Sequence, residues 1–179
     1  MNEPRDAHAR QKPLRERYRE SPHNAAITDG ATTMGGVDVD PFHGQVAPGT
    51  KDYGVVWPFG IHAAVGGYHD APNPGDMLCA ALAACLDSTI RIVADLMRVK
   101  LDALAVSVTA DVDVRGTLVV DRNVPVGFQK MRCQVRIRAA PGTDAQLLDK
   151  LIASAEASCV NMQTLRSGVA IETSVAASP

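Results

Sequence analysis

Four cysteines are the residues of this chain best suited to chemistry, because a thiolate is a nucleophile, a metal ligand and a redox centre. Cys79 and Cys85 share one apolar segment, Cys133 lies in an alternating segment, and Cys159 lies late in a second helical segment. The first twenty residues contain no apolar signal segment, so we expect a cytoplasmic protein. Thiols in that compartment stay reduced unless they do redox work.

Two of the thiols have surroundings typical of packing. Cys133 lies on the inward face of "MRCQVRIRA", where a free cysteine behaves as a small apolar residue. Cys79 lies in the first turns of a helix, where the helix dipole can lower a thiol pKa. Its neighbours Leu78 and Ala80 are nevertheless apolar. We therefore interpret Cys79 and Cys133 as structural.

The local sequence favours packing for Cys85 and leaves the role of Cys159 open. Cys85 lies eleven residues beyond Pro74, about 16 Å along a helix axis, so the dipole does not reach it. A reactive Cys85 would need a cation from elsewhere in the fold, and its own segment favours packing. Cys159 stands where polar residues begin, so solvent could reach it. It also continues an apolar helical stripe formed by Leu148, Leu151, Ile152 and Ala155.

The sequence gives little support for a metal site or a cofactor site. His62 and His69 flank a glycine-rich loop with Asp70 beside them, and a metal site with Cys79 or Cys85 is conceivable. Their spacing matches neither paired CxxC nor HExxH. The glycines of "AVGGYHDAPNPG" match neither a phosphate-binding loop nor a dinucleotide fingerprint. We expect no metal and no cofactor.

The bulk composition excludes several partners. The chain has 179 residues, a net charge of −2, 46% hydrophobic and 21% charged residues, as an ordinary globular protein does. This charge argues against nucleic acid and anionic membranes as partners. No uninterrupted apolar run reaches the roughly 18 residues of a membrane span, because Asp87, Arg91 and Asp95 interrupt the best candidate.

The elements that would position these residues follow an α+β plan. Residues 1–25 read as an N-terminal extension whose short helix covers 13–20, with Arg15, Arg17 and Arg19 on a solvated face. Strands are expected within 26–67 and, by strict alternation, within 103–139. A final strand is expected at 168–175.

Two long helices complete the plan. The first covers 74–98 and begins at a capping box made by Asn73 and Asp76, with Pro74 in the first turn. Its half from Met77 to Leu86 is apolar on every side, which predicts complete burial. The second helix covers 143–166, with Thr143 as its cap and a break near Cys159 left open. The strands thus form antiparallel sheets packed on two long helices.

Two segments together resemble one known family. "NPGDMLCAALAACLDSTI" resembles the Asn-Pro that opens a long, Ala-rich central helix in the OsmC/Ohr family (osmotically inducible and organic hydroperoxide resistance proteins). "ASAEASCVNMQTL" is similar to the later cysteine-bearing helix of that family. The resemblance covers 26–175 and implies an OsmC-like fold in an intertwined homodimer. Burial of the central helix between two subunits would account for its apolar half.

The same resemblance implies a two-cysteine peroxidase for organic hydroperoxides. In it Cys85 attacks the peroxide, Cys159 resolves the sulfenic acid, and a thiol or dithiol reductant reopens the disulfide. The sequence departs from the family at two places. Gly75 and then Asp76 follow Asn-Pro where active members carry a glutamate that orients an arginine, and Val160 follows Cys159 where a proline is usual.

Two other functions remain open at this stage. One is a non-catalytic OsmC-like dimer that binds a small apolar ligand at its interface. The other is a thiol-dependent detoxifier of a different electrophile.

Overall fold

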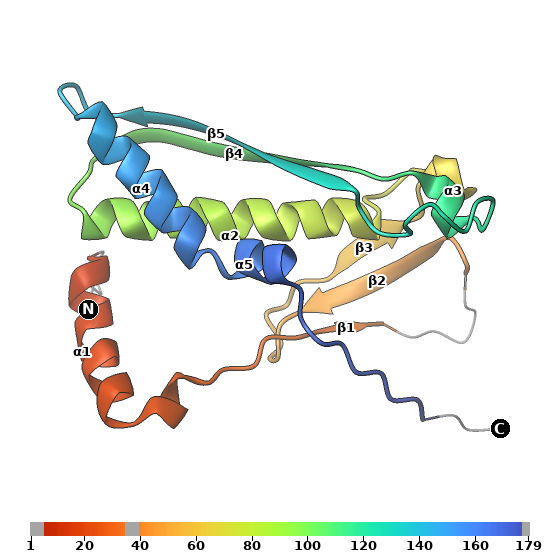
Figure 1. Ribbon diagram of the computed structural model, residues 1–179. Coiled ribbons are helices and arrows are strands. Elements are labelled where there is room, and N and C mark those ends of the chain that lie inside the picture. The colour runs from red at the N-terminus through yellow and green to blue at the C-terminus, as the bar shows by residue number, and fades with distance from the viewer. Residues whose placement is uncertain (1–5, 35–39, 177–179) are drawn as a thin grey trace. The chain divides into compact units, whose positions relative to one another are not determined.

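The computed structural model describes residues 6–34 and 40–176 and has the predicted α+β class (Figure 1). Its contacts divide the chain into two compact units. One contains the residues up to Ala81 together with Ser107–Gln134, and the other contains Leu82–Val106 and Val135–Pro179. Three elements, a helix and two strands, run from one unit into the other.

The first unit contains a three-stranded antiparallel sheet. Its strands are β1 (Ala31–Thr33), β2 (His43–Pro48) and β3 (Trp57–Gly60), in the order β1-β2-β3. Gly44 of β2 lies opposite Phe59 of β3. The Phe59 ring occupies the space that a β-carbon at residue 44 would fill, so glycine is required there. These strands fall within the predicted range 26–67.

The N-terminal helix is longer than predicted. α1 covers Ala7–Glu20, because the Asp6 side chain accepts from the Ala9 N–H at 3.0 Å and caps it. Pro13, predicted to begin the helix, lies inside it. The short 3-10 helix η1 (Pro22–Ala25) follows. No residue of α1 is buried, which agrees with a solvated helix.

The central helix α2 (Pro74–Leu96) begins as predicted and ends two residues early. Asn73 Oδ1 accepts from the N–H of Gly75 and of Asp76, and Asp76 Oδ2 accepts from the Asn73 N–H at 3.0 Å. These reciprocal bonds form the predicted capping box. The helix ends where Arg98 turns to a φ of 57°, a left-handed conformation that does not continue a helix.

The predicted complete burial of the apolar half of α2 is wrong for the single chain. Leu82 and Leu86 are buried, whereas Ala80, Ala81 and Ala84 are exposed and Leu78 is 39% exposed. Residues three or four apart share a helix face. One face therefore packs in the core and the other stays open.

One helix bears on the expectation that no segment of the chain spans a membrane. By length and composition, α2 is apolar enough to cross a membrane, although Asp87 and Arg91 lie in it. The core helix of a soluble protein satisfies the same criterion.

Two long strands form the second sheet, in the range predicted from alternation. β4 (Leu101–Asp111) and β5 (Lys130–Ala139) pair with each other alone among the described residues. The Ala140 N–H donates to the Lys100 carbonyl at one end of the pair, and the Gln129 N–H donates to the Asp111 carbonyl at the other. This pattern makes the pair antiparallel.

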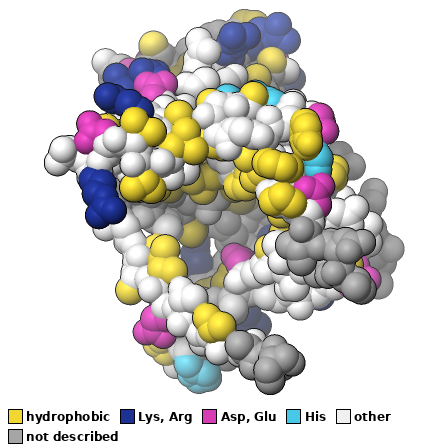
Figure 2. All heavy atoms as spheres, turned by 90° about the vertical axis from the view of Figure 1, so that its right-hand side faces the viewer, with side chains coloured by type: hydrophobic (Ala, Val, Ile, Leu, Met, Phe, Trp, Pro, Cys, Tyr) yellow, Lys and Arg dark blue, Asp and Glu magenta, His cyan; other side chains and the backbone are white. Residues whose placement is uncertain are grey.

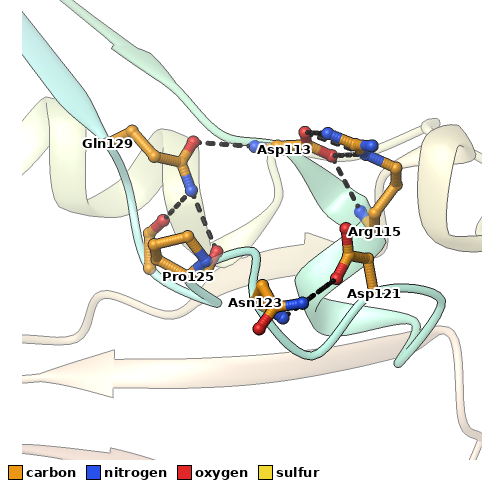
Figure 3. A network of polar contacts seen from close by, with 7 residues as sticks. Asp113, Arg115, Asp121, Asn123, Pro125 and Gln129 are labelled. Carbon is orange, nitrogen blue, oxygen red and sulfur yellow. Dashed lines mark hydrogen bonds and ion pairs between the residues drawn. The ribbon is translucent and has the colours of Figure 1, made fainter.

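The connection between β4 and β5 is held by side-chain bonds (Figure 3). It contains the one-turn helix α3 (Val114–Thr117). Gln129 Oε1 accepts from the Asp113 N–H, and Gln129 Nε2 donates to the carbonyls of Pro125 and Gly127. The Asp113 carboxylate pairs with Arg115. These bonds fix the point where β5 begins.

The second long helix is divided at Cys159. α4 covers Ala145–Ser158 and α5 covers Val160–Ser167, with Cys159 in an extended conformation between them. The cap is Asp144, whose side chain accepts from the Gln146 N–H, and not the predicted Thr143, which donates to the Ala140 carbonyl. The fully buried side chains of this unit include Leu86, Ile90, Leu151 and Cys159.

The predicted final strand at 168–175 is absent from the described chain. Gly168 ends α5, and residues 168–176 then form neither helix nor strand.

Candidate thiol site

Two cysteines from distant parts of the sequence meet in the second unit. The Cys159 sulfur lies 3.3 Å from the Cys85 sulfur, and the two residues are 74 positions apart. Both are free thiols. A disulfide needs sulfurs about 2.05 Å apart, so a small side-chain movement would join them. The structure therefore brings together the pair that the resemblance implies.

The Cys159 side chain is completely buried. The break between α4 and α5 turns its sulfur inward, where its exposure is 0%. Burial raises the pKa of the Cys159 thiol, the Met162 N–H lowers it in part, and the neighbouring Cys85 raises it further. Cys159 therefore favours its neutral form, in which its S–H points to the Cys85 sulfur. Of the two possibilities left open for Cys159, burial in the apolar stripe holds in the single chain and solvent access does not.

Cys85 is the more accessible partner, because its side chain is half-buried. Its carbonyl accepts from Ser88 Oγ at 3.0 Å and Thr89 Oγ1 at 2.7 Å, which fixes the backbone next to the thiol. Within the part of the chain that the structure describes, no arginine, lysine or histidine hydrogen-bonds to the Cys85 sulfur. None of these described residues therefore supplies, through a hydrogen bond, the cation that a reactive Cys85 needs.

The residues in place of the family glutamate have other roles here. Asp76 Oδ2 is bonded to the Asn73 backbone and, at 2.6 Å, to its side-chain Nδ2. At Gly75 a β-carbon would lie 2.9 Å from both Asn73 Oδ1 and the Phe128 ring. Asp76 is committed to the helix cap, and Phe128 fills the space beside Gly75. Neither position offers a free carboxylate.

The two thiols interpreted as structural differ from each other. Cys79 is half-buried. Burial, and to a lesser degree the Asp76 carboxylate, raise the pKa of its thiol. Cys133 is exposed, which contradicts its predicted burial. It shares a face of β5 with Met131 and Val135, but that face is uncovered at Cys133.

The histidines form no metal site in the described residues. The rings of His62 and His69 lie 4.2 Å apart, but Asp70 bonds a different histidine. His43, which the sequence analysis missed, lies with Nδ1 2.6 Å from Asp40 and Nε2 3.1 Å from Asp70. The spacing of three residues between Asp40 and His43 could have indicated their contact from the sequence, whereas the contact with Asp70 depends on the fold.

Comparison with known proteins identifies the family. The family described as OsmC-like protein matches residues 67–174, so the chain belongs to that family. This confirms the resemblance drawn from the two helical segments. No curated protein sequence matches the chain.

Solved structures show the same fold. An organic hydroperoxide resistance protein from Elizabethkingia anophelis is 21% identical, with a TM-score of 0.59 over 80% of this chain and 91% of that one. An OsmC-like protein from Mycoplasma pneumoniae is 13% identical, with a TM-score of 0.63 over 79% and 89%. A hydroperoxide resistance protein OsmC from Legionella pneumophila is 22% identical, with a TM-score of 0.52 over 79% and 90%. The predicted OsmC-like fold is confirmed.

Proposed function

We propose that this protein is a cytoplasmic thiol peroxidase that reduces organic hydroperoxides through Cys85 and Cys159. The observation that carries the proposal is the 3.3 Å separation of their sulfurs. Family membership supports it, and so does the likeness to structures named as organic hydroperoxide resistance proteins. No nucleic acid, membrane or metal takes part.

The burial of the two thiols supports one order of reaction. Cys85 reacts first, because it is half-buried while Cys159 is completely buried and kept neutral by its raised pKa. The Cys85 thiolate attacks one peroxide oxygen, the O–O bond breaks, and the alcohol leaves after taking a proton. Cys85 is then a sulfenic acid.

Resolution uses the buried partner. The Cys159 sulfur attacks the Cys85 sulfenic sulfur, the S–O bond breaks, and the oxygen leaves as water with the Cys159 proton. A thiol or dithiol reductant supplies two electrons and two protons to restore both thiols. Because Cys159 already lies beside Cys85, this step needs no large rearrangement.

We also propose a homodimer, which the exposed face of α2 supports. Leu78 and Ile92 of this helix are 39% and 41% exposed, although large side chains of its opposite face are buried. Other large apolar side chains are exposed elsewhere, and hydrophobic side chains (yellow) are visible at the surface in Figure 2. A second subunit would remove this surface from water.

A second function, binding without catalysis, is favoured by one observation. The described chain provides no basic partner for the Cys85 sulfur, and Gly75 and Asp76 provide no free acid. A thiol without such activation reacts slowly. In this alternative the dimer binds a small apolar ligand at its interface.

Thiol counting distinguishes the two functions. Reduced protein is treated with one equivalent of cumene hydroperoxide, and free thiols are titrated before and after. The peroxidase loses two thiols per chain, and the Cys133→Ser control loses the same two. Cys85→Ser should lose none. An unchanged thiol count in the wild-type protein would favour the binding function.

A further inference from the structure

The break between α4 and α5 lies in a stretch whose sequence suits one continuous helix. Residues 145–167 contain no glycine and no proline, yet α5 leaves α4 in a new direction after Cys159 (Figure 1). Sharp helix kinks usually arise at proline or glycine, or where a side chain enters the backbone hydrogen bonds. The first two causes are absent here, so a side chain is the expected cause.

The side chain of Gln163 replaces a backbone hydrogen bond at the break. In a continuous helix the Glu156 carbonyl would accept from the Val160 N–H, four residues further on. From the described backbone this carbonyl accepts only the Cys159 N–H, at the long distance of 3.4 Å. Gln163 Nε2 donates to the same carbonyl at 2.8 Å. Gln163 therefore satisfies the carbonyl that the break leaves without its helical partner.

A second contact from α5 reaches Glu156. Arg166 Nη2 lies 2.9 Å from Glu156 Oε2. Gln163 and Arg166 are three residues apart, so both lie on the face of α5 that meets the end of α4. The Arg166 and Glu156 side chains are 55% and 40% exposed, and ion pairs in water contribute little. The half-buried bond from Gln163 is therefore the stronger contact.

These two contacts span the residue that carries the buried sulfur. Cys159 alone separates α4 from α5, and its ψ of 107° is far from the helical value of about −42°. Closing the break into a continuous helix would require that rotation and would displace the Cys159 side chain. The contacts from Gln163 and Arg166 to Glu156 oppose this closure.

We propose that Gln163, assisted by Arg166, is a positioning residue for the resolving step. Through Glu156 it holds the break open and keeps the Cys159 sulfur within reach of the sulfenic acid on Cys85. Gln163 acts on the backbone and not on the reacting atoms. A misplacement of about 1 Å can slow a reaction by about a hundredfold, so a modest shift of Cys159 matters. This inference rests on the proposed peroxidase function and adds residues that the function does not itself name.

Trapping the sulfenic acid measures the resolving step by itself. Reduced protein is mixed with one equivalent of cumene hydroperoxide and an excess of dimedone. Mass spectrometry then gives the ratio of the dimedone adduct on Cys85 to the Cys85–Cys159 disulfide. Both products form from the same sulfenic acid, so the ratio reports resolution and not the speed of the first step.

Four variants make this test specific. Gln163→Leu should raise the ratio at least about tenfold, because the Glu156 carbonyl loses its donor. Arg166→Met should raise it by only about threefold or less, because the ion pair is exposed. Gln163→Lys keeps a donor of similar length and should restore a ratio close to that of the wild type. Gln146→Leu makes the same change at an exposed site of α4 and should have no effect.

The outcomes separate the positioning role from the peroxidase function. A wild-type ratio in Gln163→Leu, or an equal rise in Gln146→Leu, would overturn the positioning role and leave the peroxidase standing. A wild-type protein that forms neither the adduct nor the disulfide would overturn the peroxidase function.

An equilibrium in glutathione buffer tests the positioning without peroxide. The disulfide joins the two sulfurs in every variant, whereas the reduced protein can lose the break. Gln163→Leu should therefore lower the equilibrium constant for forming the Cys85–Cys159 disulfide at least about tenfold, and Gln163→Lys should restore it. An unchanged constant in Gln163→Leu would overturn the inference, whatever the result with peroxide.

Discussion

At the scale of single residues, Cys79 and Cys133 test whether peroxide chemistry belongs to the sulfur pair alone. Cys79→Ala should lower the free energy of unfolding by about 1 kcal/mol, because it removes a half-buried apolar group. Cys133→Ala should change stability little, because Cys133 is exposed. Neither should reduce hydroperoxide turnover. Denaturant unfolding measures the change in stability, and the thiol assay measures the change in turnover. Loss of turnover in a folded Cys79→Ala variant would mean that Cys79 is the nucleophile.

His43 gives a residue-scale prediction about pH. Hydrogen bonds that the His43 ring donates to Asp40 and then to Asp70 raise the pKa of His43 above the ordinary 6.5, so the fold favours the protonated ring. The resulting stability is fully present below pH 6.5 and is lost as pH rises through the raised pKa. The Phe42 N–H and His43 lower the pKa of Asp40. The stability that the ionised Asp40 carboxylate contributes is therefore present above pH 3.8 and is lost as the pH falls through the lowered pKa.

An NMR titration of the His43 ring checks this link. Asp70→Asn should lower the His43 pKa, because it removes one of the two carboxylates that favour the charged ring. Asp29→Asn changes an exposed aspartate with no described bond to His43 and serves as the control. An identical His43 titration in both variants would show that Asp70 does not hold the ring in solution.

The candidate site was only partly predictable at this scale. Local sequence favoured packing for Cys85, and only the pairing of two distant motifs singled out Cys85 with Cys159. Their contact spans 74 residues and depends on the fold. The exposure of Cys133 was missed, because alternation shows which face a residue is on but not whether anything covers that face.

At the scale of elements, Gly75 shows how the start of α2 is packed. Glycine to alanine within a helix usually stabilises it by about 1 kcal/mol. Here a β-carbon would lie 2.9 Å from the Phe128 ring, so we expect Gly75→Ala to destabilise the protein by roughly 1 kcal/mol or more. Gly127→Ala meets nothing within 4 Å and is the matched control.

A double-mutant cycle separates the packing conflict from other effects. Phe128→Ala makes room, so the Gly75→Ala cost should shrink when the two changes are combined. Denaturant unfolding of the four proteins gives the coupling energy. Additive effects would mean that Phe128 does not occupy the space beside Gly75.

The elements follow local sequence where local forces decide. Alternation predicted β4 and β5, and Asn73 with Asp76 predicted the start of α2. The predicted cap of α4 was wrong because Thr143 and Asp144 are neighbours and both are suited to capping. Thr143 instead donates to the Ala140 carbonyl in the turn before the helix. The predicted final strand was not found. A strand forms only where it can pair with the edge of a sheet, and the local sequence does not determine whether such an edge lies nearby.

At the scale of the whole molecule, the exposed face of α2 predicts association. We expect sedimentation to show a dimer at micromolar concentration. Ala84→Glu should weaken it by placing a charge on that exposed face, whereas Asp149→Ala, at an exposed site of α4, should not. A stable, folded wild-type monomer at that concentration would contradict the homodimer.

The central claim is catalysis by the Cys85–Cys159 pair, and turnover tests it most directly. Protein is mixed with excess cumene hydroperoxide and dithiothreitol, and the alcohol product is measured by chromatography. The account predicts many moles of alcohol per mole of wild-type protein, and none above background for Cys85→Ser. Alcohol formation that is equal in the wild-type protein and in Cys85→Ser would contradict it.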